Sequence, residues 1–306
     1  TSNGRSITLV NRCSETVWFG LLPNANSPWI GPADNIYELT ANGGSSFVEI
    51  PPSGWSGVIA GRTSCTEEKC LTADCRGGKG ACTTGFEPPA TQAEFTFKPN
   101  ERDNYDVELI NGYNIPISIT PKSLIHTDDP YFCGTPGARQ GSPGFGGCSW
   151  DFNPPYPEYN WVEGGGKECK SENECPGKDE LCGLSFNPGY DPLLRLTCGR
   201  KLGLFSANQI CGIQRNYGAP FYCSDHVIGQ ESITWYDLYS CQPKKVDTCY
   251  SKDIASPSCC GCVNWNELTL QVPPPPLTLA CYSSNPRWTE RVLPTLKWLK
   301  EACPTA

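Results

Sequence analysis

The sequence predicts a mainly β protein: an antiparallel β-sandwich or flattened barrel with a large disulfide-rich lobe and a small disulfide loop lobe. Three observations support this fold class. The chain has many short runs of alternating apolar and polar residues, little helical periodicity, and 20 cysteines among 306 residues. The Gly- and Pro-rich regions lack the apolar runs needed for a core, so we expect disulfides to hold them.

Seven segments are predicted as strands because they are short, rich in Val, Ile, Phe and Trp, and bounded by Gly, Pro or Asn. In one of them Phe95 and Phe97 fall on one side while Glu94 and Thr96 fall on the other, as the strand period of two requires. The predicted strands are residues 6–12, 16–22, 45–50, 57–61, 93–98, 104–110 and 115–120.

The spacing of cysteine and glycine divides the chain into three regions. Residues 1–60 and 86–126 are expected to form the β-sandwich core. Residues 61–85 contain four closely spaced cysteines among glycines and are expected to form the small disulfide-stapled lobe. Residues 127–306 are expected to form an enlarged disulfide-rich lobe that ends in a short helix.

The terminal helix is predicted from apolar residues that recur at spacings of three and four. Pro294 is expected to kink this helix or to confine regular helix to the part after it. The recurring residues are Trp288, Val292, Leu296, Leu299 and Cys303.

Composition restricts location and partners. A net charge of −8 and a pI near 4.9 argue against nucleic acid as a partner. No apolar run approaches bilayer-spanning length, so we expect no membrane insertion. The high cysteine content predicts an oxidising compartment, and the absence of Met predicts a mature chain whose signal peptide has been removed. We therefore expect a secreted monomer, extracellular or in the cell wall.

No metal or cofactor is predicted. Residues 259–262 read Cys-Cys-Gly-Cys, a spacing that could indicate zinc. With only two histidines and an oxidising setting, disulfides explain these cysteines better.

Five segments of the chain resemble the thaumatin-like proteins, the pathogenesis-related group 5 family. The opening VNRCSETVW at residues 10–18 and the run from Gly61 to Cys82 carry this resemblance. So do residues 88–95, 105–118 and 298–306. The long region between Cys133 and Cys303 resembles that of the enlarged fungal members.

The resemblance implies an acidic cleft between the sandwich and the large lobe. In the family this cleft is associated with β-1,3-glucan binding and, in some members, with slow endo-hydrolysis. Glu94 matches the cleft glutamate, the proposed acid, and Asp106 matches the first cleft aspartate, the proposed base or water-orienting group. Hydrolysis of a glycosidic bond needs two such carboxyl groups in opposite protonation states.

The chain departs from the family pattern at three positions. Asn111 stands where the family has its next aspartate, and an amide can bind a sugar hydroxyl but cannot take a proton. Val58 stands where an arginine is usual. The last cleft aspartate has no evident match, and Asp253 is a candidate substitute. Asn111, Tyr113 and Asp253 are thus the expected substrate-binding residues.

Aromatic residues allow two interpretations. Flat rings can stack on sugar faces, and equally they can pack around disulfides, which is the commoner role. The residues in question are Trp150, Phe152, Tyr156, Tyr159 and Trp161.

Two functions remain open from the sequence. The first is a metal-free endo-β-1,3-glucanase that acts on β-1,3-glucan or a related wall polysaccharide through Glu94 and Asp106. The alternative is a non-catalytic β-glucan-binding or antifungal defence protein of the cell wall. A third and weaker possibility is a protein-interaction or enzyme-inhibitor role for the enlarged lobe. Structural roles compete with all of them, since Glu94 could be a solvent-facing strand residue and Asp106 a strand-end residue.

Overall fold

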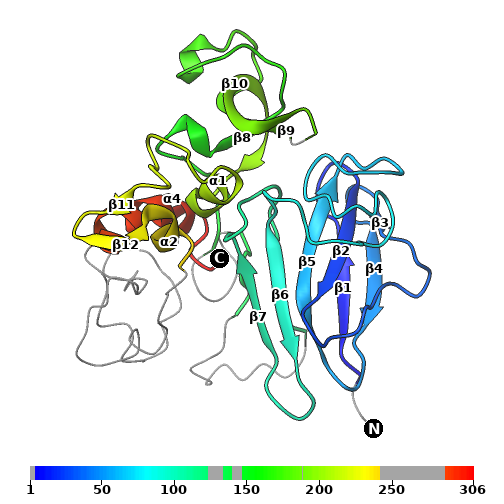
Figure 1. Cartoon of the computed structure of the whole chain (residues 1–306). Helices are drawn as coiled ribbons and strands as arrows, with labels where there is room; N and C mark the ends of the chain where they lie inside the picture. The colour runs from blue at the N-terminus through cyan, green and yellow to red at the C-terminus, as the bar shows by residue number, and fades with distance from the viewer. Residues whose placement is uncertain (1–3, 123–133, 140–146, 188, 242–286) are drawn as a thin grey trace. The chain divides into compact units, whose positions relative to one another are not determined.

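The computed structural model describes residues 4–122, 134–139, 147–187, 189–241 and 287–306. These belong to two compact units, Thr1–Thr120 and Pro121–Ala306, whose elements are labelled in Figure 1. Each unit is described by itself.

The first unit contains two antiparallel sheets. The larger has five strands in the order β3-β2-β5-β6-β7, and the smaller pairs β1 with β4 (Figure 1). The strands are β1 (Ser6–Val10), β2 (Val17–Pro23), β3 (Glu38–Leu39), β4 (Ser45–Glu49), β5 (Trp55–Thr63), β6 (Gln92–Phe97) and β7 (Asn104–Glu108).

The two sheets bury one apolar core between them. Val48 of β4 is 0% exposed and Phe19 of β2 is 1% exposed, and both belong to the same cluster. Ile7 and Leu9 of β1 pack against it as well. This arrangement confirms the predicted β-sandwich, and the described strands of this unit do not close into a barrel.

Six of the seven predicted strands are confirmed, with ends displaced by one or two residues. The strand predicted at residues 115–120 is wrong, because none of these residues pairs in a ladder. Ile117 and Ile119 still pack against the core. The alternation of apolar residues in this segment correctly indicates which side chains face the core. Pro116 lacks a backbone N–H, so it cannot donate a hydrogen bond to a neighbouring strand.

Residues 61–85 run from the end of β5 toward β6 and are closed by two disulfides, Cys65–Cys70 and Cys75–Cys82. Each disulfide joins cysteines of this segment to one another, at sequence separations of 5 and 7. Such short closures constrain the loop locally and do not tie it to the sandwich. Another interaction must therefore attach the loop.

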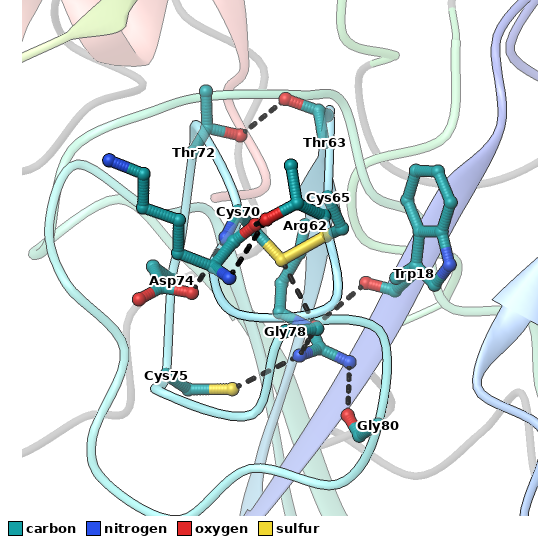
Figure 2. Close-up of a disulfide and its surroundings, with 12 residues drawn as sticks. Trp18, Arg62, Thr63, Cys65, Cys70, Thr72, Asp74, Cys75, Gly78 and Gly80 are labelled. Atoms are coloured by element: carbon teal, nitrogen blue, oxygen red, sulfur yellow. Dashed lines mark hydrogen bonds between the residues drawn. A yellow bond between two sulfur atoms is a disulfide. The ribbon is translucent and has the colours of Figure 1, made fainter.

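That interaction is made by Arg62, which points from β5 into the loop (Figure 2). Its side chain is 0% exposed, and its guanidinium donates hydrogen bonds to two neighbouring segments. The acceptors are the carbonyl oxygens of Trp18, Phe19, Gly78 and Gly80, at 2.6–3.3 Å, and the Sγ atom of Cys75 at 3.4 Å. Strand β2 and the disulfide loop are thus joined through one side chain.

Burying a cation is costly unless its donors are satisfied. Burial lowers the pKa of Arg62 to about 10, an effect that the charges of Asp74 and Tyr37 oppose. At that pKa the guanidinium stays protonated at neutral pH. Gly78 supplies one of the acceptors with φ at +49°, and a Cβ there would lie 2.1 Å from the carbonyl oxygen of Glu67. Glycine is therefore required at this position.

The second unit is built around a hairpin of β9 (Glu180–Asn187) and β10 (Asp191–Leu204). The short strand β8 (Asn160–Val162) pairs with β10 and meets β9 at one parallel position. Two disulfides, Cys169–Cys182 and Cys175–Cys198, tie the hairpin to the segment before it.

Short helices follow the hairpin, and two of them begin with capping boxes. Ser206 and Gln209 cap α1, and Thr234 and Asp237 cap α2. The elements are α1 (Ala207–Ile213), β11 (His226–Val227), β12 (Gln230–Thr234), α2 (Trp235–Tyr239), the π-helical turn η5 (Trp288–Val292) and α4 (Leu293–Ala302). Sequence periodicity did not predict α1 and α2 because each is only one to two turns long.

The predicted C-terminal helix is confirmed. Trp288, Val292 and Leu299 are buried, and Pro294 lies in the first turn of α4, where its missing N–H costs little. The disulfide Cys148–Cys303 fixes the end of α4 to a segment 155 residues earlier in the chain. No helix in the described part of the chain is both long and apolar enough to cross a membrane.

The aromatic residues of the second unit mostly pack against one another. Tyr159 is 0% exposed, and its ring centroid lies 4.9 Å from that of Trp298 and 5.2 Å from that of Phe221. Trp150 is 6% exposed, whereas Tyr156 is 47% exposed. The packing interpretation therefore holds for Tyr159 and Trp150.

We expect Arg62→Ala to lower the free energy of unfolding by at least about 3 kcal/mol, because it leaves buried carbonyl groups without donors. Urea-induced unfolding with the disulfides intact measures this. Arg12→Ala, at an exposed position, is the matched control and should change stability by no more than about 0.5 kcal/mol. Equal effects of the two substitutions would contradict a special role for Arg62.

Candidate carboxylate site

Two neighbouring strands, β6 and β7, place carboxyl groups on the face of the large sheet opposite the core. On β6 the ring of Phe95 is buried in the core, so the adjacent Glu94 faces the other side. The cross-strand register puts Val58 of β5 opposite Glu94 and puts Asp106 of β7 opposite it on its other side. Glu108, two residues after Asp106, faces the same way.

Glu94, Asp106 and Glu108 form what we call the acidic cluster. One carboxylate oxygen from each lies within 4.8 Å of the others. Asp106 is exposed, while Glu94 and Glu108 are partly buried. Among the residues the structure describes, no Lys, Arg or His forms an ion pair with any of the three. Within the described residues, their mutual repulsion is thus not offset by an ion pair.

Burial and repulsion change the protonation of the acidic cluster. Burial is the main cause that raises the pKa of Glu108 to about 7, and the charges of Glu94 and Asp106 add to it. Although the residue as a whole is exposed, partial desolvation of its carboxyl, followed by the charge of Glu94, also raises the pKa of Asp106. At mildly acidic pH Glu108 therefore carries a proton, and a protonated carboxyl is one of the two forms that acid–base chemistry needs.

The separation of the carboxyl groups limits the chemistry. Inverting glycosidases hold a water between carboxyls about 6.5–9.5 Å apart, whereas retaining enzymes separate theirs by about 5–5.5 Å. Oxygen atoms of the acidic cluster lie within 4.8 Å of one another, which is below the inverting range. Carboxyls this near leave less room for an intervening water than for direct attack by a carboxylate.

Metal binding is the other chemistry that gathered ligand atoms suggest. A calcium ion takes about six to eight oxygens, and acidic groups often lie together without an ion. In the second unit the Sγ atoms of Cys169, Cys175 and Cys198 also lie close together, but all three are in disulfides and offer no thiolate.

The other expected site residues fall in different places. The Nδ2 atom of Asn111 donates a hydrogen bond to Oε1 of Gln92 at 3.2 Å, and Gln92 is the cross-strand partner of Glu108. Asn111 is thus next to the acidic cluster without being a member of it. Tyr113 is partly buried in the segment after β7. Asp253 lies outside the described residues.

Glu108 is the cluster member that sequence reasoning missed. Its position does not match the family's cleft pattern, from which Glu94 and Asp106 were expected. The available signal was its spacing: a carboxylate two residues after Asp106 on a predicted strand must face the same side.

A shallow hollow lies elsewhere on the first unit. It encloses about 370 Å³ and is lined by parts of β1 and β4 and by Ala33 and Asp34. None of the acidic cluster residues lines it, so it is not part of the carboxylate site.

Fold and site together define a disulfide-stabilised β-sandwich protein with carboxylates on the outer face of its large sheet. The six disulfides within the described residues fit a protein that folds in an oxidising compartment. The model of the Thaumatin family matches residues 11–189, more than half of the chain. The chain belongs to the Thaumatin family, and the resemblance inferred from its motifs is confirmed.

Relatives in plants support the same assignment. "Thaumatin-like protein 1" of Arabidopsis thaliana is 36% identical over 195 residues, which is 59% of this chain and 67% of the relative. "Pathogenesis-related protein 5" of the same plant is 34% identical over 183 residues, 57% of this chain and 67% of the relative. For several other thaumatin-like relatives the match covers only 46–55% of their length.

One solved structure, that of a thaumatin-like xylanase inhibitor, is 28% identical in sequence. The match covers 33% of this chain and 64% of that one, with a TM-score of 0.26. A superposition this limited says nothing further about function.

The raised pKa of Glu108 predicts how stability depends on pH. Its folded pKa of about 7 exceeds the ordinary value of 4.5, so the native state holds the extra proton between these values and stability falls as pH rises through them. Glu108→Gln should therefore be more stable than the parent at pH 8, by about 1–2 kcal/mol after allowing for solvent screening. The difference should vanish near pH 4.

Urea unfolding at a series of pH values checks this prediction. Glu68→Gln, at an exposed position, is the control and should follow the parent curve. If Glu108→Gln also followed the parent curve, the native state would not disfavour the ionised form of Glu108.

Proposed function

We propose that this protein is a secreted, defence-related β-glucan-active protein and that it hydrolyses β-1,3-glucan slowly through the acidic cluster. The name of one relative, pathogenesis-related protein 5, supports the defence role. The disulfide content supports secretion. Family members with an acidic cleft bind or cleave this polysaccharide, as the motif resemblance implies.

The observation that carries the proposal is the pairing of Glu94 with Asp106. These residues stand at the family's cleft positions and are direct cross-strand partners on the face opposite the core. Cross-strand partners on one face hold their Cβ atoms about 4.5–5.5 Å apart, so both carboxyls can reach one bound sugar unit. A rigid sheet is a good support for such a pair, because strand register fixes their separation.

A second candidate function is glucan binding without turnover. Val58 faces Glu94 where a cationic side chain is usual in the family, so no guanidinium at that position can orient the carboxylate or stabilise charge. The side-chain amide of Asn111 donates a hydrogen bond to Gln92, and an amide cannot transfer a proton between groups. A site altered in this way could keep its affinity for a neutral polysaccharide while losing the ability to hydrolyse it.

Glu94→Gln and Asp106→Asn are each expected to lower reducing-end release from soluble linear β-1,3-glucan at least about 100-fold, because each removes a group that exchanges or attacks. Sedimentation with insoluble β-1,3-glucan should remain within a few-fold of the parent. The assays run at mildly acidic pH, with the exposed Glu68→Gln as the matched control.

Binding by the parent protein with no measurable release would favour the binding-only function. Release that both variants retain would rule out the Glu94–Asp106 pair as the reacting groups.

The short carboxyl separation also predicts the stereochemistry. Hydrolysis should retain the β configuration at the new reducing end, as expected for carboxyls about 5–5.5 Å apart. Proton NMR of fresh digests, recorded before mutarotation, distinguishes this from inversion. An α-anomer appearing first would mean that a different pair of groups, farther apart, does the chemistry.

A further inference from the structure

The shallow hollow on the first unit has the size and the lining of a small-ligand site. Its volume of about 370 Å³ falls within the range of about 300–1,000 Å³ that is typical of such sites. Among the described residues, no Lys, Arg or His lines it. The lining comes from β1, from β4 and from the segment before β3: Thr8, Ala33, Asp34, Ser45, Ser46 and Phe47.

Phe47 presents its ring to solvent at this hollow. Its neighbour Val48 is 0% exposed in the core, so strand alternation turns Phe47 toward the outer face of the smaller sheet. Its direct partner on β1 is the exposed Thr8, and Phe47 itself remains 51% exposed. A single exposed aromatic ring is ordinary. This ring, however, borders a hollow that also contains polar side chains.

The polar side chains of the hollow are available to a ligand. In the part of the chain that the structure describes, the side-chain hydroxyls of Thr8 and Ser45 make no hydrogen bond. Oδ1 of Asp34 accepts a hydrogen bond from the backbone N–H of Ile36 at 3.0 Å, an Asx-turn that orients the carboxylate. Its Oδ2 atom takes part in no ion pair or hydrogen bond among the same residues. That oxygen can therefore accept from a ligand.

These groups match an uncharged sugar ring. A pyranose face carries C–H groups, which pack favourably on the negative face of an aromatic ring. Its hydroxyls can donate to a carboxylate and exchange hydrogen bonds with serine and threonine. An acidic sugar or a phosphate would be repelled by Asp34. A cation could use the carboxylate and the ring, but a single exposed carboxylate holds a cation only weakly in water.

We propose that the hollow is a second carbohydrate site, which binds one uncharged pyranose unit of a polysaccharide through Phe47 and Asp34. The inference adds a binding site that takes no part in hydrolysis, and it rests on the proposed function only for the choice of glucan as a probe. Thr8 and Phe47 face away from the core on the smaller sheet, whereas the acidic cluster faces away from the same core on the large sheet. The two sites thus lie on opposite faces of the sandwich.

The test measures sedimentation with insoluble β-1,3-glucan, cellulose and mannan for the parent, Phe47→Ala, Phe47→Trp, Asp34→Ala and the control Tyr190→Ala. Tyr190 is a matched control because its ring is 90% exposed in the second unit. Phe47→Ala and Asp34→Ala should each lower the affinity for a bound polysaccharide about 3- to 10-fold. Phe47→Trp should keep the affinity, because a larger ring still stacks, and Tyr190→Ala should match the parent.

Two further readouts separate the hollow from the acidic cluster and from folding. Reducing-end release from soluble linear β-1,3-glucan should stay at the parent's level in every variant. The urea midpoint of Phe47→Ala should match that of the parent, since the ring is largely exposed. The loss of sedimentation is expected whether the hollow binds alone or together with the acidic cluster, because removing one attachment also lowers avidity.

Equal sedimentation of Phe47→Ala, Asp34→Ala and the parent would overturn the inference and leave the glucanase function standing. Failure of the parent to sediment with all three polysaccharides would also overturn it, even if soluble glucan were hydrolysed. So would binding that disappears in about 0.5 M salt, which would indicate a cationic partner at Asp34. Loss of soluble release in Phe47→Ala would place the hollow in the hydrolytic site instead. Sedimentation that depends on Phe47 without any release would support the hollow as a sugar site while the glucanase function fails.

Discussion

The burial of the Arg62 guanidinium is the interaction on which the first unit depends. It joins β2, β5 and the disulfide loop through backbone carbonyls, although each disulfide of the loop closes only on the loop itself. Asn114 adds a second connection, donating to the carbonyl of Gly61 and the hydroxyl of Thr72. Because β5 is the central strand and borders β6, anchoring the loop to β5 also holds the strand beside which Glu94 of the acidic cluster is aligned.

Much of the first unit could be predicted because its strands alternate cleanly. Phe95 and its neighbour Glu94 fall on opposite faces by the strand period alone, and the structure has them so. The segment with Ile117 and Ile119 satisfies the same pattern without a ladder, since alternation of apolar residues follows burial and not hydrogen bonding. Elements of the second unit such as α1 are too short for any period to be visible, and disulfides replace apolar runs as the source of their stability.

Only part of the candidate site could be predicted from the sequence. Motif resemblance pointed to Glu94 and Asp106, and strand register brings them together. Resemblance could not point to Glu108, because that position carries no family expectation. The raised pKa of Glu108 depends on its burial and on the nearness of Glu94 and Asp106, and both are properties of the folded chain. Residue types alone specify ordinary pKa values; the departures from them come from packing.

The disulfide between Cys148 and Cys303 has a consequence beyond positioning the end of α4. It encloses 155 residues of sequence in one covalent ring, and in the chain-entropy model a ring of that size removes on the order of 5 kcal/mol of unfolded-state entropy. A protease that cuts one peptide bond inside the ring does not separate the pieces. The C-terminal helix would remain attached to the cut chain, so a nicked molecule would still be a single molecule, able to refold around the same core until the disulfide is reduced.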